Sequence, residues 1–268
     1  MSIAVETKTP SRADAGSPDP VVSVVIPCLN EAENIEACVA AALEAIVRMG
    51  VPGEVVVADN DSEDDSAHLA ERAGARVIVE RRRGYGRAYR TGFAEAAGEV
   101  IATADGDGTY PVETIPALVR RLLDERIDFL SGDRMAYVDR RSMTTLHRFG
   151  NWVLNRFVAL AYHRYVRRLP ARTLADSQSG FWIFRRRVLD AVTLTQDGMA
   201  LSEELKIEAI RRGFTFVEVP IRYGERTGAP KLQSWKDGLR NLWFLAAMRL
   251  AIAREPPRAA PVDPGRDG

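Results

Sequence analysis

Two aspartates separated by one residue form the strongest candidate site in this sequence. Asp105 and Asp107 flank Gly106, directly after a short apolar run and before a helical pattern. Carboxylates in this arrangement can face one divalent cation, and Mg²⁺ or Mn²⁺ prefers oxygen ligands that the phosphates of a substrate complete. The alternative is a plain Asp-Gly turn without a ligand, because such pairs are common in loops.

A second acidic segment covers residues 59–65 and also follows an apolar run. It is not an EF-hand loop, because the sixth position is Asp64 instead of Gly and the twelfth is Ala70 instead of Glu. Acids favour helix N-termini, which accounts for residues 62–65. Asp59 is left at the strand end, where its carboxylate can accept a hydrogen bond from a base or a ribose.

Two glycine-rich segments are weaker signals. Residues 84–89 resemble the start of a dinucleotide-binding fingerprint, but Tyr89 replaces its third glycine. Residues 222–231 place several cations in a flexible loop, which suits either a phosphate clamp or a solvated surface loop. Residues 177–180 lack the spacing of a serine hydrolase elbow, and the three histidines lack metal-ligand spacing.

The elements around these segments alternate between strand and helix. Apolar, β-branched runs predict strands at Val21–Pro27, Glu54–Ala58, Arg76–Val79, Val100–Ala104 and Asp128–Ser131. Helical patterns lie between them at about 31–49, 62–73, 86–97 and 112–126. This alternation predicts an α/β fold with a mainly parallel sheet flanked by helices, and ligands that bind beyond the carboxyl ends of its strands.

The second half is less regular. It predicts one or two amphipathic helices at 142–168, strands at Trp182–Phe184 and Phe214–Ile221, and a helix at about 200–212. We expect disordered tails at 1–20 and 254–268, a main domain at 21–233, and a C-terminal amphipathic helix at 234–253.

Charge and composition restrict the class of protein. The 268 residues carry 37 basic and 37 acidic side chains, which argues against a nucleic-acid-binding protein. From Arg134 to Arg187, however, the sequence has twelve Arg and only two acidic residues, Asp139 and Asp176. This excess of positive charge favours an anionic partner such as phosphate or an acidic membrane surface. With two cysteines, no apolar leader and no long apolar run, the sequence predicts a cytoplasmic protein.

Six segments in order resemble the motifs of glycosyltransferase family 2, and within it the polyprenyl-phosphate sugar synthases. The resemblance runs from about Val22 to Trp235. The segments are Val24–Glu31, Asp59–Ser62, Asp105–Asp107 with Pro111 and Glu113, Ser131–Arg134, Asp176–Phe181, and Glu218–Pro220 followed by Arg226, Gly228 and Lys231.

The resemblance implies a fold of the glycosyltransferase A type, a nucleotide-sugar donor such as GDP-mannose or UDP-glucose, and inversion at the anomeric carbon. It implies a Mg²⁺ or Mn²⁺ ion held by Asp105, Asp107 and Thr109. It implies nucleotide contacts from Pro27, Leu29, Glu31, Asp59, Asn60, Arg87 and Asp105. It implies that the catalytic residues are Asp107, Arg134, Asp176, Arg226 and Lys231.

The acceptor separates two enzyme interpretations. A polyprenyl phosphate is already ionised and needs no strong base, whereas a hydroxyl acceptor needs a carboxylate such as Asp176, Glu203 or Glu204. The basic stretch and the apolar side of helix 234–253 favour the lipid phosphate and peripheral binding at the cytoplasmic membrane face. Packing of that helix on the sheet is the alternative. A non-catalytic, nucleotide-binding partner subunit is the remaining hypothesis.

Overall fold

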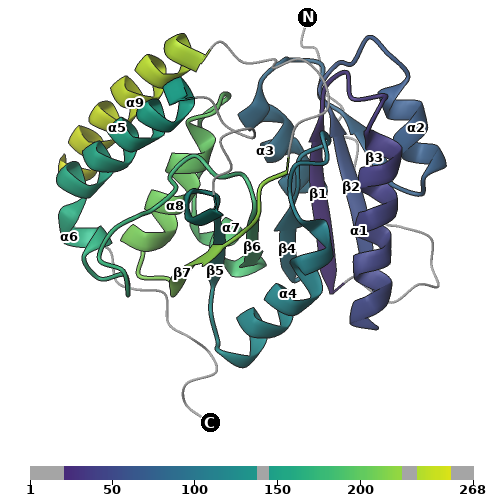
Figure 1. Cartoon of the computed structure of the whole chain (residues 1–268), viewed down its shortest axis with the longest axis horizontal. Helices are drawn as coiled ribbons and strands as arrows, with labels where there is room; N and C mark the ends of the chain where they lie inside the picture. Colours follow the sequence, from purple (N-terminus) through teal and green to yellow (C-terminus); the bar gives the residue numbers. More distant parts are fainter. Residues whose placement is uncertain (1–20, 138–144, 225–233, 255–268) are drawn as a thin grey trace, which may run out of the picture.

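The computed structural model describes residues 21–137, 145–224 and 234–254, and it builds them around a seven-stranded sheet of order β3-β2-β1-β4-β6-β5-β7 (Figure 1). The strands are β1 (Val22–Cys28), β2 (Gly53–Asp59), β3 (Arg76–Val79), β4 (Val100–Thr103), β5 (Phe129–Asp133), β6 (Trp182–Arg185) and β7 (Phe216–Pro220). Neighbouring strands pair in parallel, except that β6 is antiparallel to both β4 and β5. The predicted α/β fold with a mainly parallel sheet is therefore confirmed.

Helices cover both faces of the sheet, which explains why its central strands are apolar on both sides. In β1, Val24 and Ile26 belong to one hydrophobic core and Val25 belongs to the other. The first core includes α1 (Ile35–Met49), α2 (Ser66–Arg72) and α4 (Ile115–Asp124). The second includes α3 (Tyr85–Glu95), α5 (Thr145–Ala161), α6 (His163–Val166), α7 (Arg186–Ala191), α8 (Leu201–Arg211) and α9 (Ser234–Arg254). Two short 3₁₀ helices, η1 (Val112–Thr114) and η2 (Met135–Tyr137), complete the described elements.

Helix α2 begins later than the sequence predicts. The pattern predicts a helix from residue 62, but α2 starts at Ser66 because side chains hold the preceding residues in a loop. The carboxylate of Asp59 accepts the Ser62 backbone N–H at 3.2 Å, and the Asp64 carboxylate accepts that of Ser66 at 3.0 Å. Asp61 between them has a left-handed φ of 64°. These bonds compete with the helical ones, so the acidic segment forms a loop before the helix instead of its first turn.

The C-terminal helix α9 lies beside α5 in Figure 1 and packs one of its sides against the protein, which is the packing alternative of the two predicted for it. Leu245 and Ile252 are buried, and Leu245 O accepts a 2.7 Å hydrogen bond from the Tyr162 hydroxyl. Trp243 on another side is 74% exposed. No helix in the described ranges is both long and apolar enough to cross a bilayer. The predicted tails lie outside these ranges apart from Arg254, where α9 ends.

The sheet brings the predicted motifs to one edge. β1, β2, β4 and β5 all end there at Cys28, Asp59, Thr103 and Asp133, and antiparallel β6 begins there at Trp182. Strand order reverses direction between β1 and β4, since β2 and β3 lie on one side of β1 and the later strands on the other. Open sheets of this kind bind ligands at such a reversal.

Candidate active site

The Asp105-Gly106-Asp107 turn lies against the end of β1. A Cβ atom on Gly106 would lie 3.4 Å from both Pro27 O and Glu31 Cγ, so the turn packs closely against the end of β1 and the residues after it. Burial, followed by the charge of Asp107, raises the pKa of the neighbouring Cys38 thiol to about 11. Asp105 and Glu31 act in the same direction, so all three carboxylates lie near this thiol.

Asp107 is held by its own turn. It is 4% exposed, and its Oδ1 atom accepts hydrogen bonds from Thr109 N at 3.1 Å and Thr109 Oγ1 at 2.7 Å. Through these two hydrogen bonds, Thr109 orients the Asp107 carboxylate. Predicted contacts of Thr109 and Asp107 with a metal ion stay predictions.

The residue types of this turn fit a hard divalent cation that is shared with a substrate. Asp105 and Asp107 supply carboxylate oxygens, and Gly106 lets the backbone approach β1. Within the described ranges, no group of three or more His, Cys, Asp or Glu side chains is arranged to hold a metal ion. Two carboxylates would thus leave most of the coordination sphere to phosphate oxygens and water.

Asp59, at the end of β2, carries an unused acceptor. Its side chain is 3% exposed, and its Oδ2 atom accepts the Ser62 N–H. Its buried Oδ1 atom has no hydrogen-bond partner among the described residues. Buried acceptors without partners are rare and costly in folded proteins, so this oxygen is suited to a donor from a ligand or water.

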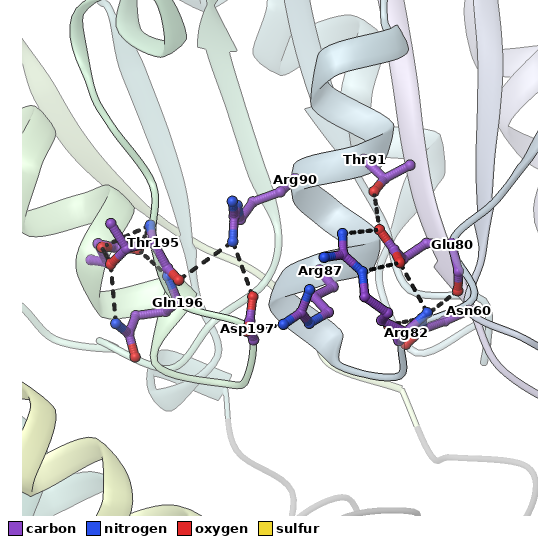
Figure 2. Close-up of polar contacts among 10 residues, drawn as sticks. Asn60, Glu80, Arg82, Arg87, Arg90, Thr91, Thr195, Gln196 and Asp197 are labelled. Atoms are coloured by element: carbon purple, nitrogen blue, oxygen red, sulfur yellow. Dashed lines mark hydrogen bonds and ion pairs between the residues drawn. The ribbon is translucent and has the colours of Figure 1, made fainter. Parts of the chain in front are cut away.

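Asn60 and Arg87, both predicted to contact the nucleotide, are engaged with the protein itself (Figure 2). The Asn60 amide donates to Glu80 O and Arg82 O, each at 2.9 Å, and accepts from Gly84 N at 2.7 Å. The Asn60 side chain therefore fixes the conformation of the loop that leads into α3. Arg87 donates to the Asp197 carboxylate at 2.5 Å, and Arg90 binds the same carboxylate at 3.0 Å.

Asp197 was missed by the sequence analysis although it joins two distant parts of the chain. Its carbonyl accepts the Gly86 N–H at 2.9 Å, and a Cβ on Gly86 would lie 2.3 Å from Gln196 O. The second glycine of segment 84–89 therefore serves close packing of a protein loop. No short motif surrounds Asp197, so only its contacts identify this role.

A layer of tyrosines connects the acidic turn with the end of β5. The Tyr89 hydroxyl donates to Asp105 Oδ1 at 3.2 Å, and the Tyr110 hydroxyl accepts the Gly180 N–H at 2.8 Å. Tyr223 hydrogen-bonds Thr109, and the guanidinium of Arg134 lies 5.3 Å from the centre of its ring. Tyr223 therefore joins the predicted metal motif to a predicted catalytic cation. No motif in the sequence predicts a role for these tyrosines.

Arg134 and Asp176 form a buried ion pair. Arg134 Nε donates to Asp176 Oδ2 at 2.7 Å and Arg134 Nη2 donates to Oδ1 at 2.9 Å, which is a two-pronged contact. The side chain of Asp176 is completely buried and that of Arg134 is 11% exposed. Burial raises the pKa of Asp176, but the charge and hydrogen bonds of Arg134, together with the charge of Lys206, outweigh burial and lower the pKa to about 2.

Two further buried groups fix the Asp176 segment. Lys206 Nζ donates to Asp176 O at 2.6 Å, and burial lowers the pKa of this ammonium to about 8 against the attraction of Asp176. The Glu218 carboxylate accepts the backbone N–H groups of Ala175 and Asp176 at 2.7 and 3.0 Å. Neither Lys206 nor this role of Glu218 was predicted. The sequence signal that could have indicated the role of Lys206 is a lysine within a helix whose other residues are almost all buried.

Glu203 and Glu204, the other predicted bases, are enclosed at the start of α8. Glu203 is completely buried, it bonds Gln178, and its Oε2 atom has no partner among the described residues. Burial raises the pKa of Glu203 to about 8. Glu204 accepts the backbone N–H groups of Thr195 and Gln196 at 2.9 and 3.0 Å.

Replacing Glu203 by Gln is expected to stabilise the protein increasingly as the pH rises from 5 to 8. The folded state keeps this proton up to a pKa of about 8, while the unfolded chain releases it near 4.5, so wild-type stability falls across that window. We expect a gain of roughly 5 °C in melting temperature at pH 8 and little gain at pH 5. Scanning calorimetry at several pH values measures this.

Glu125→Gln is the matched control, because Glu125 forms only an exposed pair with Arg121 on α4. Its melting-temperature difference from wild type is expected to be small and independent of pH. A Glu203→Gln gain that did not grow with pH would contradict a buried, protonated Glu203.

Arg226 and Lys231 lie outside the described residues. The last described residue before them, Gly224, donates its backbone N–H to Thr109 O at 2.8 Å. The segment that carries both cations therefore starts at the predicted metal motif.

Comparison with known proteins places the chain in a family. The family model for glycosyl transferase family 2 matches residues 23–193. A low-salt glycan biosynthesis hexosyltransferase of Haloferax volcanii is 34% identical over 84% of this chain, although the chain spans only 53% of that relative. A dolichyl-phosphate hexose transferase of the same organism is 33% identical over 76% of this chain and 85% of its own length.

Solved structures agree on the fold. Glucosyl-3-phosphoglycerate synthase of Mycobacterium tuberculosis, in complex with Mn²⁺, UDP and its product, superposes with a TM-score of 0.68 at 22% identity, over 87% of this chain and 80% of the synthase. The same synthase has also been solved with Mg²⁺ and UDP. This likeness establishes the glycosyltransferase A-type fold. Sequence and fold together show that the chain is a glycosyltransferase and belongs to glycosyl transferase family 2.

Proposed function

We propose that the protein is an inverting, metal-dependent transferase that moves a hexose from a nucleotide sugar to a polyprenyl phosphate. An oxygen of the lipid phosphate attacks the anomeric carbon and forms a new C–O bond. The bond from that carbon to the nucleoside diphosphate breaks, and the diphosphate leaves with the electron pair. The donor is GDP-mannose or UDP-glucose.

The state of the three candidate bases carries this proposal. A hydroxyl acceptor needs a carboxylate that is ionised and can reach it. Asp176 is buried in its pair with Arg134, Glu203 is buried with a raised pKa, and Glu204 is bonded to backbone N–H groups. A phosphate acceptor needs no such base, because it is already ionised at neutral pH.

The donor side has support of its own. The partnerless Asp59 Oδ1 suits the ring N–H that both guanine and uracil present. Pro27 lies at the end of the adjacent strand β1, and Leu29 and Glu31 follow it, so we assign all three to the same nucleotide. We assign Asn60 and Arg87 indirect roles, since Asn60 braces the loop before α3 and Asp197 orients Arg87.

Asp105 and Asp107 would hold the metal ion, which would offset negative charge on the departing diphosphate. Arg134 lies across the tyrosine layer from these carboxylates and would add a fixed positive charge. Asp176 orients that guanidinium. We assign Arg226 and Lys231 to the same diphosphate on the resemblance to the family and the Gly224–Thr109 contact.

A lipid acceptor also accounts for apolar side chains that face solvent on α5 and α9. Phe149 and Trp152 stack on α5 with ring centres 6.0 Å apart, and both are exposed. Leu239, Trp243 and Leu250 are exposed on the adjacent α9. Exposed aromatic and aliphatic groups on neighbouring helices suit a membrane interface, so we propose peripheral binding there.

A transfer assay with purified protein tests the proposal. Labelled GDP-mannose and UDP-glucose are each supplied with Mn²⁺ and a short polyprenyl phosphate in detergent, and the matching polyprenol is the control acceptor. We expect an acid-labile glycolipid from the phosphate and none from the alcohol. Transfer to the alcohol, or release of nucleotide without a lipid product, would reject the phosphate acceptor.

A further inference from the structure

Three arginines in the segment that follows α6 line one cavity. Arg167, Arg168 and Arg172 surround a volume of about 330 Å³, and we call this the arginine pocket. The volume lies in the lower part of the range of small-molecule sites, about 300–1,000 Å³. All three side chains are exposed. Among the described residues, none that is predicted for the active site lines this pocket.

The backbone of the arginine pocket is fixed to the core. Consecutive turns close through the bonds Arg167 N to His163 O at 3.0 Å, Arg168 N to Tyr165 O at 3.0 Å, and Arg172 N to Leu169 O at 2.9 Å. Val166, Leu169 and Leu174, which alternate with the arginines, are all buried. Three guanidinium groups around one cavity thus belong to a turn that is fixed to the core. Folding therefore supplies part of the free energy that is needed to bring them together, and a ligand has less to order when it binds.

No described carboxylate balances the charge of the arginine pocket. None of its three arginines has an ion pair with a described carboxylate, whereas Arg76, Arg134 and Arg187 each have one. The sequence has no acid between Asp139 and Asp176. Neighbouring guanidinium groups repel one another, and a bound anion relieves that repulsion through two-pronged hydrogen bonds.

We propose that the arginine pocket binds a phosphate ester, and that the ester is the headgroup of an anionic phospholipid next to the lipid acceptor. The choice of a lipid rests on the proposed function and on the chain just before the pocket. Helix α5 exposes Phe149, Trp152 and Leu160, and α6 then leads to Arg167. At a membrane surface, apolar side chains contact the acyl chains and arginines contact the phosphate headgroups. The exposed apolar residues of α5, followed by the arginines of the pocket, suit these two layers.

The test compares two triple variants of the full chain that lose equal charge. Arg167→Gln/Arg168→Gln/Arg172→Gln removes the pocket, and Arg72→Gln/Arg81→Gln/Arg120→Gln removes three other exposed arginines. Co-sedimentation uses vesicles of phosphatidylcholine, with and without phosphatidylglycerol. A second arm measures binding of inorganic phosphate and glycerol phosphate by calorimetry.

Wild type is expected to bind the anionic vesicles, and the pocket variant is expected to bind them roughly 100-fold more weakly, about fivefold per arginine. The control variant is expected to stay near wild type. Loss of soluble phosphate binding in the pocket variant alone, with unchanged vesicle binding, supports the phosphate site and assigns it a soluble ester. Equal behaviour of the two variants in both arms overturns the proposal.

These measurements use no donor and no acceptor, so they stand apart from the transfer assay. Failure of wild type to glycosylate a short polyprenyl phosphate in detergent rejects the proposed function and leaves vesicle binding to be judged by itself. The pocket variant is expected to keep that detergent activity, because its three arginines lie outside the transfer site.

Discussion

Replacing Asp107 by Asn is expected to lower turnover by about 100- to 1,000-fold while leaving the melting temperature close to that of wild type. The change removes a negative charge and almost nothing else. Asp107 Oδ1 accepts from Thr109 N and Thr109 Oγ1, and the amide oxygen of Asn can accept the same two bonds. Loss of activity would therefore report on the charge needed for a cation and not on the shape of the turn.

The measurement is the rate of hexose transfer as a function of Mn²⁺ concentration, with circular dichroism as the check on folding. Asp124→Asn is the matched control, because Asp124 is an exposed aspartate at the end of α4. It should retain full activity at every Mn²⁺ concentration. Near-normal turnover of Asp107→Asn would remove the basis for a metal ion at this turn.

Local patterns predict the fold well because parallel strands between two helical layers are apolar on both sides. Residues 22–28 and 53–59 are recognisable as strands for this reason, and the acids that follow them mark the edge where ligands bind. The direction of β6 was not predicted. Its pairing with β4 and β5 depends on contacts between residues 51 to 85 positions apart, which no short pattern records.

The site could be predicted as a set of residues but not as a set of contacts. Arg87 was predicted to face the nucleotide, yet its partner Asp197 lies 110 positions away. The Arg134–Asp176 pair is a second example. Both residues were predicted for the site, but the contact between them was not. Sequence motifs identify residue types at an edge, whereas the partners of each side chain depend on loops from other parts of the fold.

Replacing Arg134 by Met is expected to lower the free energy of unfolding by about 3–5 kcal/mol and to abolish transfer. Methionine keeps much of the volume but leaves the Asp176 carboxylate buried without its cation. Asp176 would then retain the Lys206 charge nearby and the Asn151 amide at 3.2 Å. Urea unfolding measures the stability, and the transfer assay measures turnover per folded molecule.

Adding Asp176→Asn separates the structural effect from the catalytic one. The double variant carries no unpaired buried charge, so it is expected to recover most of the lost stability. Turnover is expected to stay low, because the positive charge beside Tyr223 is still missing. Arg187→Met provides the matched control, since Arg187 pairs with the buried Asp128. It should lower stability without changing turnover per folded molecule. Recovery of turnover in the Arg134→Met/Asp176→Asn variant would show that Arg134 serves the fold and not the reaction.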